Sequence, residues 1–436
     1  MSKTQLNYHA GEGARKNWII KEQLFDRTKL GKCEAIFCQG NGYIGQRAAL
    51  EEQYTAECRD LFVTGTFDRF GEEEVTELPN LADFTNFRIW INGEEFRMDA
   101  GTLKDYAREL DIYTGVLHRK VIWVSPAGAE VELNFERIVS LAEEHVIAFR
   151  ISLRSLNGDI KVRIASGIDG TMSNGGTQHF HEGNKRLYDE NLMEYTASTG
   201  ESKVHIVQYA GHRIYLQGKE ISPYLLPVIE RRYLGIRTDV SVAANSELVV
   251  EKICCVYTSR DKEANLKEKT WNTQERSVES AKCYLLRGYE DIRLAGEAAW
   301  KKYWDTTDIQ IKSQNPYDQL AIRFALYHLN IMIKRDDDRV GIGAKGLSGE
   351  GYKGHSFWDT EIFLFPFYLF TDPKAAGTLL SYRGKSLQGA QKKAYENGYQ
   401  GAMFPWESAW LDDGEVTPVW GGADVVTGEP IPINTG

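Results

Sequence analysis

The spacing of apolar residues changes type close to Ser259, and this change is the strongest constraint on the fold. Before it, short runs of Val, Ile, Phe and Tyr alternate with polar residues and end at turn signals, which is typical of strands. Two of these turns contain Asn-Gly, the strongest short signal for a β-hairpin, at Asn92-Gly93 and Asn157-Gly158. The clearest runs are Phe87–Ile91, Val121–Val124, Val131–Ile138, Val146–Leu153 and Ile160–Ile168. The pattern predicts a large antiparallel sandwich over roughly the first 260 residues.

After Ser259 the apolar residues recur at helical spacing. Glu275–Trp304 is rich in Ala, Glu, Lys and Leu, and it predicts a helical connector. A short strand is predicted at Ile309–Lys312. Asn315-Pro316 then marks a helix start, because Asn is a favoured N-cap and Pro fits the first helical position. Asp372-Pro373 opens another helix in the same way, and Asn397-Gly398 ends it.

This order of strands and then helices predicts three parts of the chain. They are a β-sandwich domain at 1–262, a helical linker at 263–312 and the N-terminal part of a helical catalytic domain at 313–436.

Charge and apolar composition exclude several classes of partner. The 436 residues carry a formal charge of −10 without a block of Lys or Arg, so nucleic acid and anionic membranes are not expected as partners. The polar N-terminus lacks the apolar stretch of a signal peptide, and the longest apolar run, Ile362–Phe370, is far short of a membrane span. The six cysteines are thinly spread, as expected for reduced thiols. These features predict a cytoplasmic protein.

Neither a metal nor an organic cofactor is expected. Cys33 and Cys38 have no second cysteine pair at zinc spacing, and His179-Phe180-His181 is expected in a Gly/Asn-rich loop without a partner cluster. Gly40–Gly45 and Gly341–Gly346 both fit G-x-G-x-x-G, but neither lies in a βαβ unit, which a dinucleotide site requires. Turns with positive φ at glycine explain both motifs.

Two motifs place an indole directly before a carboxylate, at Trp358-Asp359 and Trp406-Glu407. An aromatic face can stack on the C–H groups of a sugar ring, while a carboxylate accepts hydrogen bonds from its hydroxyls. Aromatic and acidic residues are also common at helix starts, where the helix dipole favours carboxylates. The glycine-rich segment Gly349–Gly354 and the repeat of the pairing favour a carbohydrate site formed by these four residues.

At these residues the sequence resembles glycoside hydrolase family 65, which contains maltose, kojibiose, nigerose and trehalose phosphorylases. The matching segments are Gly40–Arg47, Ala344–Leu347, Gly349–Tyr352, His355–Phe363, Tyr382-Arg383, Gly398–Ala402 and Phe404–Ser408. The resemblance implies a β-supersandwich, a helical linker and an (α/α)6 barrel, of which this chain would hold an incomplete part. It also implies inverting phosphorolysis of an α-linked glucosyl disaccharide to β-glucose 1-phosphate and glucose, with inorganic phosphate as co-substrate.

The resemblance further implies functions for individual residues. Trp358 and Asp359 would bind the glucosyl unit, Trp406 and Glu407 would line the pocket, and similar enzymes suggest a homodimer. The catalytic glutamate of the family lies in a later Gly-Pro-Asp-Glu-Tyr motif, which this sequence does not contain, so the general acid is expected beyond Gly436 and no catalytic residue is assigned. The 436 residues alone are therefore expected to give no phosphorolysis. A related α-glucoside hydrolase and a non-catalytic carbohydrate-binding fragment are the alternatives.

Overall fold

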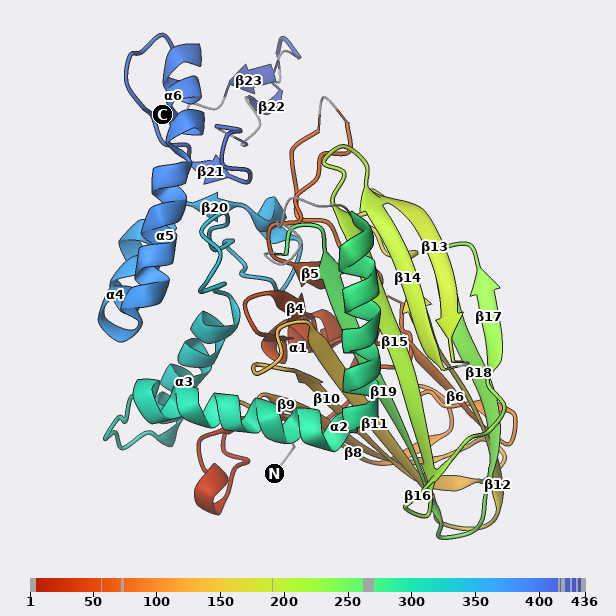
Figure 1. Ribbon diagram of the computed structural model, residues 1–436. Helices are drawn as coiled ribbons and strands as arrows, with labels where there is room; N and C mark the ends of the chain where they lie inside the picture. The colour runs from red at the N-terminus through yellow and green to blue at the C-terminus, as the bar shows by residue number, and fades with distance from the viewer. Residues whose placement is uncertain are drawn as a thin grey trace.

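Two antiparallel sheets form most of the chain up to Thr258 in the computed structural model, which describes residues 5–55, 57–71, 74–189, 191–261, 270–414, 416, 420–423, 426–428 and 430–432 (Figure 1). The larger sheet runs in the order β1 (Leu6–Asn7), β2 (Ile19–Glu22), β8 (Thr102–Asp111), β9 (Val116–Val124), β10 (Glu130–Val139), β11 (Val146–Ser155), β19 (Glu247–Thr258), β15 (His205–Leu216), β14 (Leu192–Thr199) and β13 (Phe180–Tyr188), with β16 (Lys219–Ile221) paired to β15. The smaller sheet runs β17 (Leu226–Glu230), β18 (Tyr233–Val242), β12 (Ile160–Asp169), β6 (Phe87–Ile91) and β7 (Glu94–Glu95). A third, short sheet contains β3 (Gln39–Gly40), β4 (Ile44–Gln46) and β5 (Leu61–Val63).

Each of the five apolar runs predicted as strands lies in a strand, namely β6, β9, β10, β11 and β12. Asn92-Gly93 forms the predicted hairpin between β6 and β7, and both residues have positive φ. The second Asn-Gly turn differs, because Asn157-Gly158 carries the chain from β11 in the larger sheet to β12 in the smaller one. The Asn157 side chain instead bonds to the turn that joins β9 to β10. Its Oδ1 accepts from Glu130 N, and its Nδ2 donates to Gly128 O. The predicted sandwich is confirmed.

The main hydrophobic core lies between the two sheets and includes Trp123, Phe149, Ile164 and Val250. Strands β9 and β10 alternate between buried and half-buried residues, as expected when one face is packed on a core. Strand β19 is buried on both faces over almost its whole length. This follows because helix α2 (Thr270–Thr307) covers the outer face of the same sheet.

Helix α2 bends at Gly288, whose φ is 74°, and its two halves run in different directions (Figure 1). The helix predicted at Glu275–Trp304 is thus present, with an interruption that the pattern did not predict. At the bend the Tyr289 amide donates to the Glu251 carboxylate at 3.1 Å. The segment around the bend packs on the large sheet, while Trp300 in the second half stacks on Tyr327 of α3 (Pro316–Ile331).

The helices after the linker begin as the sequence predicts. The Asn315 side chain accepts from Tyr317 N at the start of α3, and Asp372 accepts from Ala375 N at the start of α5 (Pro373–Lys385). The single helix predicted from there to Asn397 is wrong, because a second helix, α6 (Leu387–Glu396), follows α5 after a break at Ser386. The remaining elements are α1 (Leu30–Ile36), α4 (Phe365–Thr371), β20 (Ser356–Phe357), β21 (Glu407–Ser408), β22 (Trp420–Ala423) and β23 (Pro430–Pro432), together with the short helical turns η1 (Gly13–Arg15), η2 (Arg27–Lys29), η3 (Gly351–Gly354) and η4 (Thr360–Leu364).

The strand predicted at Ile309–Lys312 is wrong. In this extended segment the backbone bonds to the side chain of Gln319, which accepts from Ile311 N at 2.7 Å and donates to Ile309 O at 2.8 Å. A side chain thereby occupies the backbone groups that a neighbouring strand would need.

The predicted domain boundary at 262/263 lies outside the described residues, and the boundary at 312/313 falls between α2 and α3. Both remain predictions. Searched over the described residues, the helices include none with the length and apolar character that a bilayer span requires.

Candidate functional site

A two-stranded pairing brings the two indole and carboxylate motifs together. Strand β20 pairs antiparallel with β21, with Ser356 opposite Ser408 and Phe357 opposite Glu407 (Figure 1). Trp358 directly follows β20 and Trp406 directly precedes β21, so the two indoles emerge at the same end of the pairing. The sequence motifs are about fifty residues apart, and this pairing is what makes them one site.

The aromatic side chains form a continuous group at this end. The Trp358 and Trp406 rings are 4.9 Å apart and nearly perpendicular, and Phe357 contacts Trp406 edge to face at 5.7 Å. Edge-to-face packing fixes the orientation of each ring. Trp358 remains 38% exposed, which leaves part of its surface accessible to a ligand.

Asp359 lies beside this aromatic group at the start of the π-helical turn η4. One of its carboxylate oxygens, Oδ2, is buried and has no hydrogen-bond partner among the described residues. A buried acceptor without a donor costs about 1–3 kcal/mol, and such groups are uncommon in folded proteins. A ligand hydroxyl is one donor that would remove this cost.

The neighbouring turn is held by α5. Arg383 donates from Nε to the Glu361 carboxylate at 2.7 Å and from Nη1 to Ser408 Oγ at 3.1 Å. One guanidinium therefore connects the turn after Asp359 to strand β21. This contact fixes Asp359 relative to Trp406 through rigid elements rather than through loops alone.

Glu407 is engaged by a histidine. Its Oε2 lies 2.6 Å from Nδ1 of His355, a residue that is buried and directly precedes β20. The other ring nitrogen, Nε2, lies 2.5 Å from the backbone oxygen of Thr76 in the β-sandwich domain. Glu407, which is predicted to line a sugar pocket, therefore has its carboxylate oriented by the contact with His355.

His179 is part of a polar cluster, and the loop predicted at His179-Phe180-His181 is wrong for the last two residues, because Phe180 and His181 begin strand β13. Its ring lies 3.0 Å from the Asp68 carboxylate and 2.9 Å from that of Glu77, and Lys353 donates to Glu77 at 3.1 Å. Burial disfavours the imidazolium, but the hydrogen bonds to both carboxylates outweigh it and raise the pKa of His179 to about 9. The same bonds lower the pKa of Asp68 and of Glu77 against the opposing effect of burial.

The cluster and the site are adjacent along the chain. Glu77 follows Thr76, the partner of His355, and Leu78 N donates to Lys353 O at 2.9 Å. Sequence patterns missed this arrangement because the partners of His179 are 111 and 102 positions away from it. Among the described residues, no group of three or more His, Cys, Asp or Glu side chains could hold a metal ion.

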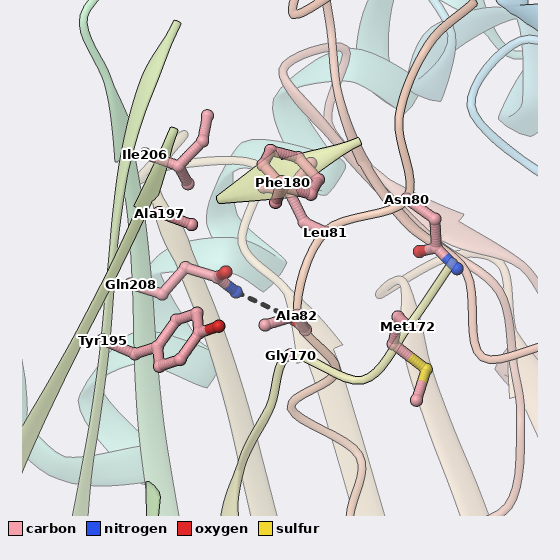
Figure 2. A pocket seen from close by; sticks show the side chains of 10 residues that line it. All are labelled: Asn80, Leu81, Ala82, Gly170, Met172, Phe180, Tyr195, Ala197, Ile206 and Gln208. Carbon is pink, nitrogen blue, oxygen red and sulfur yellow. Dashed lines mark hydrogen bonds between the residues drawn. The ribbon is translucent and has the colours of Figure 1, made fainter. Parts of the chain in front are cut away.

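Two cavities lie away from this pairing of strands. The pocket in Figure 2 lies against the inner face of β14 and β15, has a volume of about 10 Å³, and is bordered by Gln208, which donates to Ala82 O at 2.8 Å. That volume holds about one water molecule. A hollow of about 450 Å³ lies between α2, α3 and α4, where Lys334 and Arg335 are engaged by the carboxylates of Asp336 and Asp372.

The comparisons with known proteins agree with this architecture. Residues 20–303 match the N-terminal domain of glycosyl hydrolase family 65, and residues 323–436 match the central catalytic domain of that family. The chain belongs to glycosyl hydrolase family 65. The resemblance found in the sequence is thereby confirmed.

Several curated members of the family are similar over nearly the whole chain. The kojibiose phosphorylase of Halothermothrix orenii is 44% identical over 98% of this chain and 55% of its own length, and that of Escherichia coli is 38% identical over 94% and 52%. The nigerose phosphorylase of Lachnoclostridium phytofermentans is 29% identical over 90% and 53%. The chain spans about half the length of the curated relatives it matches.

A solved structure shows the same fold. A protein from the human microbiome, described as a candidate kojibiose phosphorylase, superposes with a TM-score of 0.84 at 22% identity, over 96% of this chain and 54% of its own. The predicted order of a β-sandwich followed by helices is confirmed by this likeness together with the described elements.

Proposed function

We propose that this chain binds the glucosyl unit of an α-linked disaccharide and takes part in its inverting phosphorolysis to β-glucose 1-phosphate and glucose. The observation that carries the proposal is the buried Oδ2 of Asp359, which has no hydrogen-bond partner in the described part of the chain, next to the partly exposed indole of Trp358. Together they offer an acceptor for sugar hydroxyls and an apolar surface for the C–H face of the ring. Membership of the family and the named activities of the relatives support the reaction.

The chemistry of phosphorolysis determines which groups an active site for this reaction must provide. An inverting hydrolase needs a general acid and a base that activates water. Phosphate is already an anionic nucleophile, so a phosphorylase needs a general acid at the glycosidic oxygen and a site that orients phosphate. Trp358 and Asp359 would fix the glucosyl ring, which keeps its anomeric carbon in line with the incoming phosphate. We assign no general acid among the described residues.

The proposal extends to substrate, partners and location. Kojibiose is the first substrate to test, since the relatives at 44% and 38% identity are kojibiose phosphorylases. Inorganic phosphate is the proposed co-substrate, without a metal or organic cofactor. We also propose a cytoplasmic protein that forms a homodimer, with neither nucleic acid nor membrane as a partner. The reduced cysteines and the charge of −10 support the location and the absence of polyanionic partners.

Titration with glucose and kojibiose tests the sugar site directly, with tryptophan fluorescence or calorimetry as the readout. We expect Trp358→Ala and Asp359→Asn each to weaken binding about tenfold or more, because each removes a contact of about 1.4 kcal/mol. Asp239→Asn is the matched control, because Asp239 is an exposed carboxylate on β18. Unchanged binding by both site variants would refute the proposal. Release of glucose 1-phosphate from kojibiose only when phosphate is present distinguishes a phosphorylase from a hydrolase of the same family.

A further inference from the structure

The hydrogen-bond partners of His355 fix where its protons lie. The Thr76 backbone oxygen can only accept, so His355 Nε2, 2.5 Å away, must carry a hydrogen. The contact of 2.6 Å between Nδ1 and Glu407 Oε2 then contains one further proton, either on the ring or on the carboxyl group. The buried His355 and the half-buried Glu407 therefore form a dyad that shares a proton.

The dyad connects two parts of the chain that are far apart in sequence. Thr76 lies 279 positions before His355, and Glu407 lies 52 positions after it. On one side, the segment around Thr76 is fixed by the backbone pairing of Asp68 with Glu77 and by the charged His179 between their carboxylates. On the other side, Glu407 begins strand β21, directly after Trp406.

The loop that carries His355 is held against the β-sandwich domain by the same segment. Lys353 reaches Glu77 with its ammonium group and accepts from Leu78 N with its backbone oxygen. Tyr352 and Lys353 both have positive φ, a conformation that non-glycine residues adopt when the surroundings hold them in it. Hydrogen bonds thus connect the Asp68, Glu77 and His179 cluster, through Thr76 and His355, to the carboxylate next to the Trp406 indole.

We propose that His355 is a positioning residue of the sugar site: its Nδ1 contact with Glu407 sets the orientation of that carboxylate and of the adjacent Trp406, while its bond to Thr76 O keeps a hydrogen on Nε2. The expected effect of His355 on sugar binding rests on the proposed function. The positioning of Glu407 and Trp406 by His355 does not depend on a ligand. His355 has both ring nitrogens engaged and does not itself contact the sugar in this assignment. It acts through Glu407 and Trp406.

Two conservative variants separate the two hydrogen bonds. The amide nitrogen of Asn matches His Nδ1, so His355→Asn keeps a donor toward Glu407, whereas the amide nitrogen of Gln matches Nε2, so His355→Gln keeps only the donor toward Thr76. Each variant removes one of two buried bonds, and we expect similar losses of thermal stability. We expect glucose affinity to stay within about threefold in His355→Asn and to fall about tenfold in His355→Gln. Equal affinities in the two variants would show that His355 is only structural.

Nuclear magnetic resonance tests the positioning without a ligand. In the unchanged chain, the His355 Nε2 signal should be that of a protonated nitrogen; a bare Nε2 would overturn the proposal. The indole N–H signal of Trp406, assigned with Trp406→Phe, should shift in His355→Gln and stay in place in His355→Asn. His181→Gln, at an exposed histidine, is the control and should leave it unchanged. If the unchanged chain binds neither glucose nor kojibiose, the proposed function fails, while these spectra still decide whether His355 positions Trp406.

Discussion

Replacing His179 by Gln should remove a pH-dependent part of the stability of this protein. His179 is 3% exposed, and its bonds to Asp68 and Glu77 raise its pKa to about 9, from about 6.5 in an unfolded chain. The two values differ by about 2.5 pH units, and each unit corresponds to about 1.4 kcal/mol, so the charged ring contributes roughly 3 kcal/mol. Because the folded pKa is the higher one, this contribution is complete below about pH 6.5 and is lost as the pH rises through about 9.

Urea unfolding at a series of pH values from about 6 to 10, followed by tryptophan fluorescence, measures this contribution. Other groups titrate in both proteins, so the informative quantity is the difference in unfolding free energy between the unchanged chain and His179→Gln. We expect this difference to fall by about 3 kcal/mol across the range, and the exposed His181→Gln to show no such fall. A difference that stays constant with pH would refute the assignment of a charged His179 between two carboxylates.

Two further substitutions probe packing and buried charge. Gly115→Ala should destabilise the fold by at least about 2 kcal/mol, because Gly115 has φ of 72° and an added Cβ would lie 2.2 Å from the Trp300 ring. Gly128→Ala, at a similar φ but in open space, should cost about half as much, and thermal unfolding compares the two. Arg119→Ala should cost about 3–5 kcal/mol by leaving the buried Glu52 carboxylate without this cation and Glu51 with Arg137 as its remaining one, whereas Arg163→Ala, at an exposed ion pair, should give no measurable change in urea unfolding. Equal losses within either pair would contradict the reasoning.

The strands were predictable where one face of the sheet is buried, because burial on one side imposes the alternation that the sequence shows. Strands β9 and β10 are examples, with buried residues at every second position along most of their length. The break in α2 was not predicted, because Gly288 is a single glycine inside a strong helical pattern. At the bend the Tyr289 amide donates to Glu251 of the large sheet, a tertiary contact that the helical pattern does not show.

The residue types of the candidate site were predictable from the sequence, but the contacts that bring these residues together were not. Trp358-Asp359 and Trp406-Glu407 stand out by residue type, and whether they bind a sugar remains a prediction. The pairing of β20 with β21 has no sequence signature, because two-residue strands are too short to show a period. The bond from His355 to Thr76 was equally hidden, because the partner atom belongs to the backbone and any residue type would supply it.

The bend in α2 also limits which insertions and deletions this protein can accept. Each added residue turns the rest of a helix by about 100°, so one extra residue between Gly288 and Trp300 would rotate the indole away from Gly115 and Tyr327. The half before Gly288 would keep its contacts with the large sheet, because the break separates the registers of the two halves. Length changes in related chains should therefore gather at the bend itself or beyond Thr307 and avoid the twelve positions from Tyr289 to Trp300.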